Sequence, residues 1–416
     1  MTENQFQTRY ILILVMLAST LGQVATDIYL SSLPDLTLIF NTSSELLKLT
    51  ITVVYFGYAL MQFITGPLSD LYGRKFFMLL GLGIFILGAI LAQNSQTIES
   101  LILARLIQGM GIGSFGVANR AILFDTFTGN QYIRAIAIVG IAMTVSSLVA
   151  PMLGATIHQS FGWRANFSLS LLYAGLLFFA VLVFLPETIN FKISKNLESK
   201  NILSFILSNY QVIIISKQYW KYGLINMLGF SVFIFYLSSA PFIFQEELNY
   251  NNIQYARAIC WLAVGYIAGS AIGGRVVKSY GPKVTISIGN YCQLLAGLIM
   301  FIFYINNTTS IVTILGPMVF FVFGNGFITP SATSLLINNF PNRAASAAAA
   351  MGTLMTMGTA VLNAILFHFG SHTLIFIVII ISSSALAVRI IFYGDPNPTD
   401  GVYIEGTGNT GGTSSI

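Results

Sequence analysis

Long apolar stretches, each of about 20 residues or more, follow one another along most of this chain. A stretch of that length spans the hydrocarbon core of a membrane as an α-helix. The chain is 55% hydrophobic and only 8% charged, whereas soluble domains average about 25% charged residues. No globular core can absorb this excess of apolar residues. The sequence therefore predicts an all-α integral membrane protein.

The apolar stretches form two sets of six, about twelve spans in all. The expected spans lie near residues 10–33, 47–65, 77–95, 98–123, 133–157 and 166–185, then 220–243, 257–277, 284–305, 309–337, 345–368 and 372–393. A polar, lysine-rich stretch separates the two sets. It predicts an N-terminal half (1–186), a linker (187–219) and a C-terminal half (220–393). The remaining residues, 394–416, are rich in Gly, Thr, Ser, Asn and Pro, which predicts a disordered tail.

Positive charges gather on one side of these spans. That side holds Arg9, Arg74, Lys75, Arg134, Lys192, Lys195, Lys200, Lys217, Lys221, Arg275, Lys278, Lys283, Arg343 and Arg389. The other side holds Lys48, Arg164 and Arg257. The positive-inside rule then places both termini, the linker and the tail in the cytoplasm. The net charge of +5 is thus a topology signal, and we expect no nucleic-acid partner.

Two loops in matching places have similar sequences. GPLSDLYGRK occupies positions 66–75, after the second span, and GRVVKSYGPK occupies positions 274–283, after the eighth. The paired glycines keep their spacing, and a basic residue ends both segments. Such a match favours a duplicated transporter made of two pseudo-symmetric halves.

Three segments resemble motifs of the major facilitator superfamily. Residues 66–75 resemble its loop signature Gly-x-x-x-Asp-x-x-Gly-Arg-Lys. Residues 105–109 resemble the fourth-helix motif Arg-x-x-Gln-Gly of its proton-coupled drug exporters, and residues 26–34 resemble the first-helix segment of the Bcr/CflA branch. The fifth helix departs from the antiporter pattern Gly-Pro-x-x-Gly-Gly and keeps Pro151 and Gly154.

This resemblance implies a fold and a function. It implies a monomeric drug:proton antiporter of the bacterial inner membrane that exports drugs and contributes to antibiotic resistance. Its partners would be small-molecule substrates, protons and the lipid bilayer. The energy would come from the proton gradient, so no cofactor is expected. The two cysteines, Cys260 and Cys292, both fall within apolar spans, and no cluster with metal-ligand spacing is seen, so no metal site is expected.

Asp27 and Arg105 are ionisable residues within expected spans. Asp27 lies in an otherwise uncharged apolar segment from Tyr10 to about Leu33, and Arg105 lies in the fourth span. Ionisable groups at bilayer depth are costly and therefore indicate functional sites. Both are expected about 10 Å below the periplasmic surface, at a rise of 1.5 Å per residue. We expect Asp27 to bind the transported proton, and Arg105 to adjust how tightly the Asp27 carboxyl holds it. The alternatives are that the two residues form a fixed ion pair, or that Asp27 is a solvated acid near the membrane surface.

The loop signature predicts a gate at the cytoplasmic side. By the family pattern, Arg74 and Asp125 form a charge cluster, and Asp70 faces the start of a helix in the other half. Gly66 and Gly73 permit a tight turn beside Lys75. Such contacts would hold the outward-open state. The alternative for these charges is a plain topology signal.

A transport cavity needs aromatic walls and a few polar groups. The candidates are Tyr29, Tyr55, Tyr58, Gln108, Phe115, Asn119, Asn226, Phe230, Phe233, Tyr236, Gln293 and Asn325. The alternative for the polar ones is hydrogen bonding between helices. Pro151 and Gly154 are read either as close helix packing or as a hinge.

These patterns favour a proton-coupled exporter of small lipophilic molecules that works by alternating access. A dedicated carrier for a metabolite or siderophore, importing or exporting, is the second hypothesis. An enzyme is not expected, because the chain has neither a Gly-x-x-x-x-Gly-Lys-Ser/Thr phosphate loop nor a His-Glu-x-x-His motif.

Overall fold

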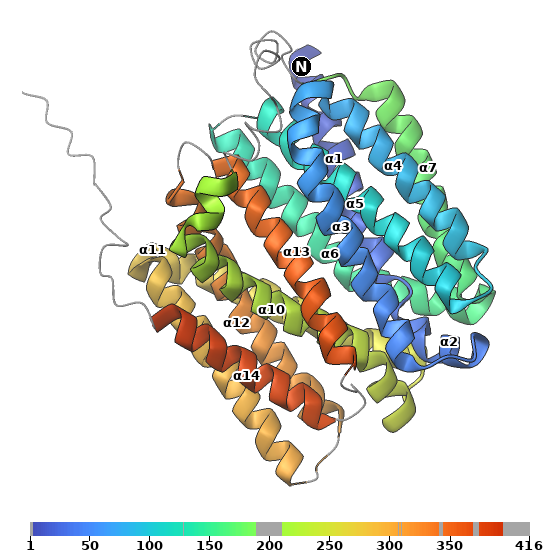
Figure 1. Ribbon diagram of the computed structural model, residues 1–416, viewed down its shortest axis with the longest axis vertical. Helices are drawn as coiled ribbons and strands as arrows, with labels where there is room; N and C mark the ends of the chain where they lie inside the picture. Colours follow the sequence, from blue (N-terminus) through green and yellow to red (C-terminus); the bar gives the residue numbers. More distant parts are fainter. Residues whose placement is uncertain are drawn as a thin grey trace, which may run out of the picture.

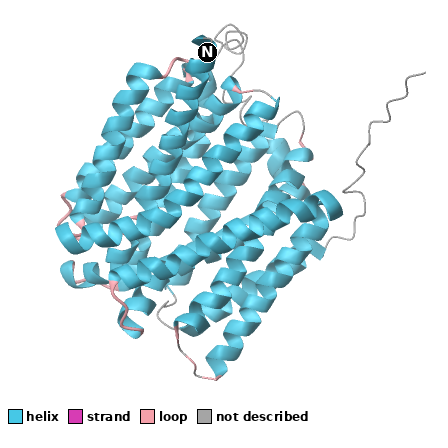
Figure 2. Cartoon of the chain, turned by 180° about the vertical axis from the view of Figure 1, so that it is seen from behind, coloured by secondary structure: helices cyan, strands magenta, loops and turns pink. Residues whose placement is uncertain are grey.

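The computed structural model describes residues 3–127, 129–188, 210–306, 308, 310–340, 344–368 and 374–393. Within these residues the regular structure is entirely helical (Figures 1 and 2). The expected tail, 394–416, and most of the expected linker lie outside the described residues. Residues 210–215 of that linker are helical, and the first helix of the second half begins at Lys217.

The helices form two bundles that lie side by side (Figure 1). The first contains α1 (Glu3–Asp27), η1 (Leu30–Ser32), α2 (Leu33–Ile39), α3 (Ser44–Tyr72), α4 (Arg74–Gln93), α5 (Ile98–Thr126), α6 (Gly129–Phe161) and α7 (Arg164–Phe184). The second contains α10 (Lys217–Phe242), η3 (Ile243–Glu247), α11 (Asn252–Ile305), α12 (Ile311–Asn338), α13 (Ala344–His368) and α14 (Leu374–Tyr393). These bundles are the N half and the C half.

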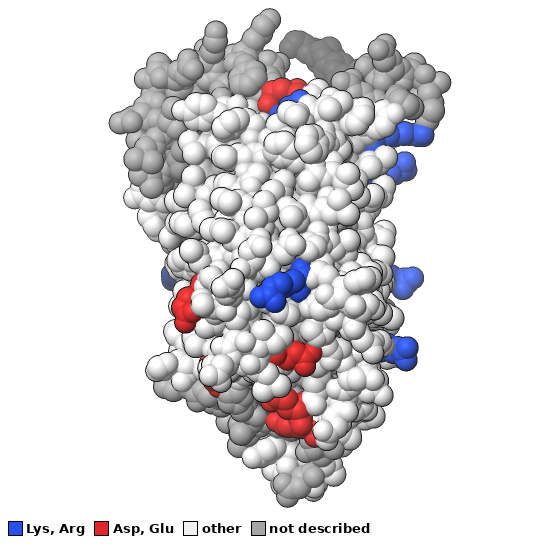
Figure 3. Space-filling view, turned by 90° about the vertical axis from the view of Figure 1, so that its right-hand side faces the viewer, with Lys and Arg blue, Asp and Glu red and all other residues white. Residues whose placement is uncertain are grey.

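Among the described residues, 10 helices are long and apolar enough to cross a membrane. One of them, α11, has 54 residues and turns at Gly281, so it supplies two passes. The apolar helix α14 supplies one more. The prediction of about twelve spans in two sets of six is therefore confirmed. Figure 3 shows one flank of the molecule, on which charged side chains are few and a broad band without charge lies between those at the top and those in the lower half.

The two loops with similar sequences contain similar turns. Gly73 ends α3 with a φ of 106°, and Gly281 breaks α11 with a φ of 78°. Side chains rarely adopt this left-handed region, so glycine is required at both places. The second glycine of each repeated segment thus makes the same turn between consecutive membrane passes.

The two bundles together have two distinct ends. We call the end where α1 begins and α3 finishes the linker end, and the opposite end, where α2 and η3 lie, the α2 end (Figure 1). At the α2 end one apolar cluster contains buried residues of both halves, such as Leu47, Phe167, Phe242 and Phe321. Toward the linker end there are two clusters instead, one within the N half and one within the C half joined by Tyr210 and Ile213. Among the described residues, the apolar cluster at the α2 end is thus the one that contains helices of both halves.

Glycines hold α3 close against α5. A Cβ added to Gly109 would overlap the backbone of Val54, and one added to Gly57 would overlap the Leu106 carbonyl. Small residues at a helix interface allow such close approach of backbones. These two helices therefore pack backbone against backbone.

The first span differs from its expected form. The apolar run predicts one helix from about 10 to 33, but α1 ends at Asp27, and the short helices η1 and α2 follow. Pro34 begins this new helix near its N-terminus, where its missing N–H costs nothing. Asp27 therefore occupies the last position of a helix and not its interior.

Candidate functional site

Asp27 is buried at the end of α1 and is held by neutral donors. One carboxylate oxygen accepts a hydrogen bond from Gln23 Nε2 at 2.8 Å, and the other accepts one from Thr26 Oγ1 at 3.1 Å. Only 5% of the residue is exposed. Both donors come from the last two turns of α1, so the helix itself positions the acid. Sequence analysis did not single out Gln23, although its position one turn before Asp27 is the signal that could have found it.

Arg105 lies fully buried on α5. Its Nη1 donates to the Ala25 carbonyl at 3.0 Å and to Gln108 Oε1 at 2.7 Å. The guanidinium lies over the Tyr29 ring, 4.4 Å from the ring centroid, which adds a cation–π contact. Its Nε and Nη2 have no hydrogen-bond partner among the described residues, and neither has Gln108 Nε2. Three buried donors are thus left unused in this conformation.

Asp27 and Arg105 share one region without forming an ion pair. Among the described residues, the structure contains no Asp27–Arg105 contact within 4.0 Å. Both lie within electrostatic range of Tyr55, and Arg105 bonds to the carbonyl only two residues before Asp27. The fixed ion pair is therefore not present here. The acid is separated from its nearest cation, so it can change protonation without breaking a bond to arginine.

Some of the expected cavity residues lie where the two halves meet. Tyr55 on α3 and Phe230 on α10 pack edge to face, with ring centroids 5.6 Å apart. Tyr29 and Tyr236 belong to the shared apolar cluster, and Phe233 packs against it. The hydroxyl of Tyr29 bonds to Thr50 Oγ1 at 2.7 Å, while that of Tyr236 has no partner among the described residues.

Other expected cavity residues lie within one half. Phe115 belongs to the apolar cluster of the N half, Tyr58 packs against that cluster, and Asn119 donates to Ser19 Oγ at 3.3 Å. In the C half, Gln293 donates to Asn325 Oδ1 at 2.7 Å, Asn325 donates to the Gly229 carbonyl at 3.2 Å, and Asn226 contacts the Met351 sulfur at 3.9 Å. These contacts are of the interhelical kind that sequence analysis kept as the alternative.

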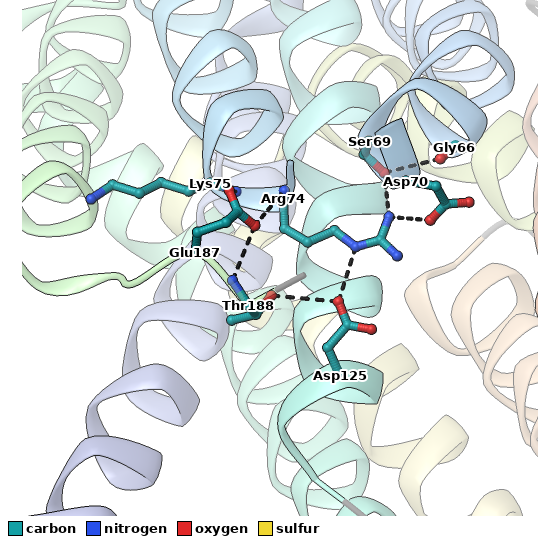
Figure 4. A network of polar contacts seen from close by, with 8 residues as sticks. All are labelled: Gly66, Ser69, Asp70, Arg74, Lys75, Asp125, Glu187 and Thr188. Atoms are coloured by element: carbon teal, nitrogen blue, oxygen red, sulfur yellow. Dashed lines mark hydrogen bonds and ion pairs between the residues drawn. The ribbon is translucent and has the colours of Figure 1, made fainter. Parts of the chain in front are cut away.

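The loop between α3 and α4 forms a polar network at the linker end (Figure 4). Arg74 forms an ion pair with Asp70 and donates from Nε to Asp125 at 3.0 Å. Its Nη1 also donates to Ser69 Oγ at 2.7 Å, and Ser69 in turn donates to the Gly66 carbonyl at 2.9 Å. These contacts join α3, α4 and α5 within the N half. The expected role of Asp70 toward the other half stays a prediction.

Glu187 completes this network and was missed by sequence analysis. Its carboxylate accepts the backbone N–H of Arg74 at 2.8 Å and that of Lys75 at 3.2 Å. It therefore caps the N-terminus of α4, where free N–H groups and the helix dipole favour a negative charge. Lys75 also donates from Nζ to the Leu182 carbonyl at 2.9 Å, which joins α4 to the end of α7. Glu187 lies 113 positions from Arg74 in the sequence, so only the fold brings them together.

Arg74→Gln should destabilise the N half. It leaves Asp125, whose side chain is only 19% exposed, without its guanidinium partner. The loss of one partner of a partly buried pair should cost about 2 kcal/mol, less than for a fully buried pair. We expect a lower apparent Tm in detergent, measured by the loss of helical circular dichroism. Arg134→Gln is the matched control, because Arg134 is an exposed arginine on α6; equal Tm values for the two variants would contradict the prediction.

Pro151 and Gly154 lie on α6 beside the break in α1. Pro151 is inside the helix, and Gly154 is buried against the Ile28 carbonyl, into which an added Cβ would project. Gly154 thus allows α6 to approach the residue that follows Asp27. This contact supports the packing interpretation, and the hinge stays a prediction.

Two further polar groups at the α2 end were missed. His158 has a side chain only 12% exposed and lies 2.6 Å from Asp35 Oδ2. Lys48, counted as a loop charge, is 1% exposed in the first turns of α3. Lys48 is the second residue of the span expected at 47–65, and this position could have indicated that its side chain is buried. No group of three or more His, Cys, Asp or Glu that could hold a metal occurs in the part of the chain that the structure describes.

Comparison with known proteins identifies relatives along nearly the whole chain. A sequence model described as "Major Facilitator Superfamily" matches residues 15–363. Multidrug resistance protein D of Escherichia coli is 26% identical over 95% of this chain and all of its own. The bicyclomycin resistance protein homolog of Haemophilus influenzae is 24% identical, over 84% of this chain and 87% of its own.

Solved structures show the same architecture. The xylose transporter XylE from E. coli, in a partially occluded inward-open conformation, matches with a TM-score of 0.72. The match covers 95% of this chain and 99% of that one, at 15% sequence identity. At this identity the likeness concerns the fold alone.

Proposed function

Because the chain belongs to the Major Facilitator Superfamily, and so is a multi-pass membrane transporter and not an enzyme, we propose that it exports small lipophilic organic molecules in exchange for protons. Relatives named for resistance to multiple drugs, to bicyclomycin and to chloramphenicol support drugs as the substrate class. The distribution of Lys and Arg supports an orientation with the linker end in the cytoplasm, across a bacterial inner membrane. We take the monomer as the working unit.

The observation that carries this proposal is the environment of Asp27. The acid is buried where the two halves share their core, and its partners are the neutral donors Gln23 and Thr26. A carboxylate bound to a fixed cation would be locked in its charged form, whereas neutral donors can also serve a protonated acid. Asp27 is therefore suited to bind and release a proton within the cycle.

The proposed cycle uses the two ends in turn. Substrate enters from the linker end while the α2 end is closed by the shared apolar cluster. The α2 end then opens, a proton from outside binds Asp27, and the substrate leaves. The protonated protein returns and releases the proton to the cytoplasm. Arg105 favours this release, because its charge stabilises the ionised acid across the intervening space.

Transport in proteoliposomes with an imposed pH gradient tests this function. A lipophilic cationic dye should move against its own gradient only while the pH gradient persists, and an ionophore that exchanges protons for potassium should stop it. Dye movement unaffected by the ionophore would contradict proton coupling. If no dye moves but the purified protein releases protons when a metabolite is added, the dedicated carrier becomes the better reading.

A further inference from the structure

Lys48 lies outside the site described above and reaches from one half into the other. It belongs to α3 of the N half and is 1% exposed. Its Nζ lies 4.9 Å from the ring centroid of Phe242 and 5.9 Å from that of Phe367. Both rings belong to the C half, on α10 and α13 respectively. A cation of one half is thus held by aromatic faces of the other.

The aromatic pair is itself firmly packed. Phe367 stacks on Phe235 with ring centroids 5.1 Å apart, and all three rings belong to the shared apolar cluster. The acidic side chains Glu45 and Glu246 lie within electrostatic range of Lys48, one on each half. The ammonium is therefore enclosed by groups that favour a positive charge.

Two hydrogen bonds also join the halves at the α2 end. Gln245 Nε2 donates to the Ser31 carbonyl at 3.0 Å, and Asn252 Nδ2 donates to Asp35 at 3.3 Å. Ser31 and Asp35 belong to the N half, and Gln245 and Asn252 to the C half. Lys48 is thus one of several contacts between the halves at the α2 end, and these contacts must break when the halves separate there.

We propose that Lys48 is the gate residue of the α2 end: its ammonium, held between Phe242 and Phe367, keeps this end closed and withdraws into water when the end opens. The inference goes beyond the proposed function and needs only a cycle in which the α2 end opens. In this proposal Lys48 acts on the conformational equilibrium and not on the binding of the transported proton.

The energetics predict in which direction a substitution shifts the equilibrium between the closed and the open α2 end. Burying an ammonium costs free energy, and attraction to the aromatic faces offsets part of that cost when water is excluded. Removing one ring while the charge stays in place leaves the cation poorly compensated in the closed state only, because the open state hydrates it. Phe242→Leu should therefore favour opening. If Lys48 is first replaced by Met, no charge is stranded, and the same ring substitution should have little effect.

A double-mutant cycle measures this coupling. The reporter is Ser31→Cys, a fully buried position whose backbone contacts Gln245 of the other half, in a background with Cys260→Ala and Cys292→Ala. The readout is its rate of labelling by a membrane-impermeant thiol reagent. Phe242→Leu should raise this rate about tenfold when Lys48 is present, and less than about twofold in the Lys48→Met background.

Matched controls separate the gate from general packing. Lys221 lies over the rings of Tyr222 and Phe392, all within the C half, so Lys221→Met should leave the labelling rate unchanged. Phe242→Tyr keeps an aromatic face and should label like the starting protein. Equal effects of Phe242→Leu in both Lys48 backgrounds, or no effect in either, would overturn the proposal. These readings need neither substrate nor a pH gradient, so they stand apart from the test of drug export.

Discussion

Asp27→Asn is expected to abolish gradient-driven dye transport, down to the level of protein-free liposomes, while the protein still folds. Asparagine has the shape of the protonated acid and keeps an oxygen that can accept from Gln23 or Thr26. It cannot gain or lose a proton, so the coupling step is removed and little else. Dye bound at equilibrium should therefore persist when transport is lost.

The matched control for Asp27→Asn is Glu99→Gln. Glu99 is a carboxylate at the same end of the molecule, but it is exposed in the first turn of α5. Its neutralisation should leave dye transport unchanged. If Asp27→Asn transports as fast as the unmodified protein, the coupling acid must be sought elsewhere, and the proposed role of Asp27 is wrong.

Gly154→Ala should produce the second large effect, a loss of about 3 kcal/mol of stability together with impaired transport. The added methyl group projects into the Ile28 carbonyl, which is backbone and cannot move aside as a side chain would. To relieve this overlap, α6 must shift away from the turn after Asp27. The apparent Tm in detergent and the rate of dye transport measure the two consequences.

Gly140→Ala controls for the change of residue type. Gly140 lies on the same helix, and a Cβ there meets no atom within 4 Å. Alanine favours a helix over glycine by about 1 kcal/mol, so this variant should be as stable as the original protein or slightly more so. A similar fall in Tm for both variants would show that the contact with Ile28 is not the cause.

The sequence predicts most of the fold because membrane spans are encoded locally. An apolar run of sufficient length must form a helix when no water can satisfy its backbone, so the number and order of spans follow from the positions of the apolar runs in the sequence. The break in α1 could not be predicted in this way. Ile28 to Leu33 remains as apolar as the helix before it, and these residues pack against α6 and the C half, which the sequence does not reveal.

The candidate site was predicted unevenly. Asp27 and Arg105 were found because charges are rare in apolar runs, and the structure places them in one region. The direct pair was not found, since backbone and neutral side chains supply their hydrogen bonds. Glu187 and Lys48 lie near the ends of spans, where charges are common, and only the fold shows that one caps α4 and the other contacts the opposite half.

The long helix α3 connects the two ends of the molecule. It carries Lys48 near one end and Asp70 near the other, and its 29 residues span about 43 Å. Gly57 of α3 and Gly109 of α5 bring the backbones of the two helices together, so α3 has little freedom to bend between its two ends. A tilt of α3 that separates its Lys48 end from the C half then brings its Asp70 end closer to the neighbouring helices, and the reverse tilt does the opposite. Such a lever would keep both ends from standing open at once, so that ions do not leak through and discharge the membrane.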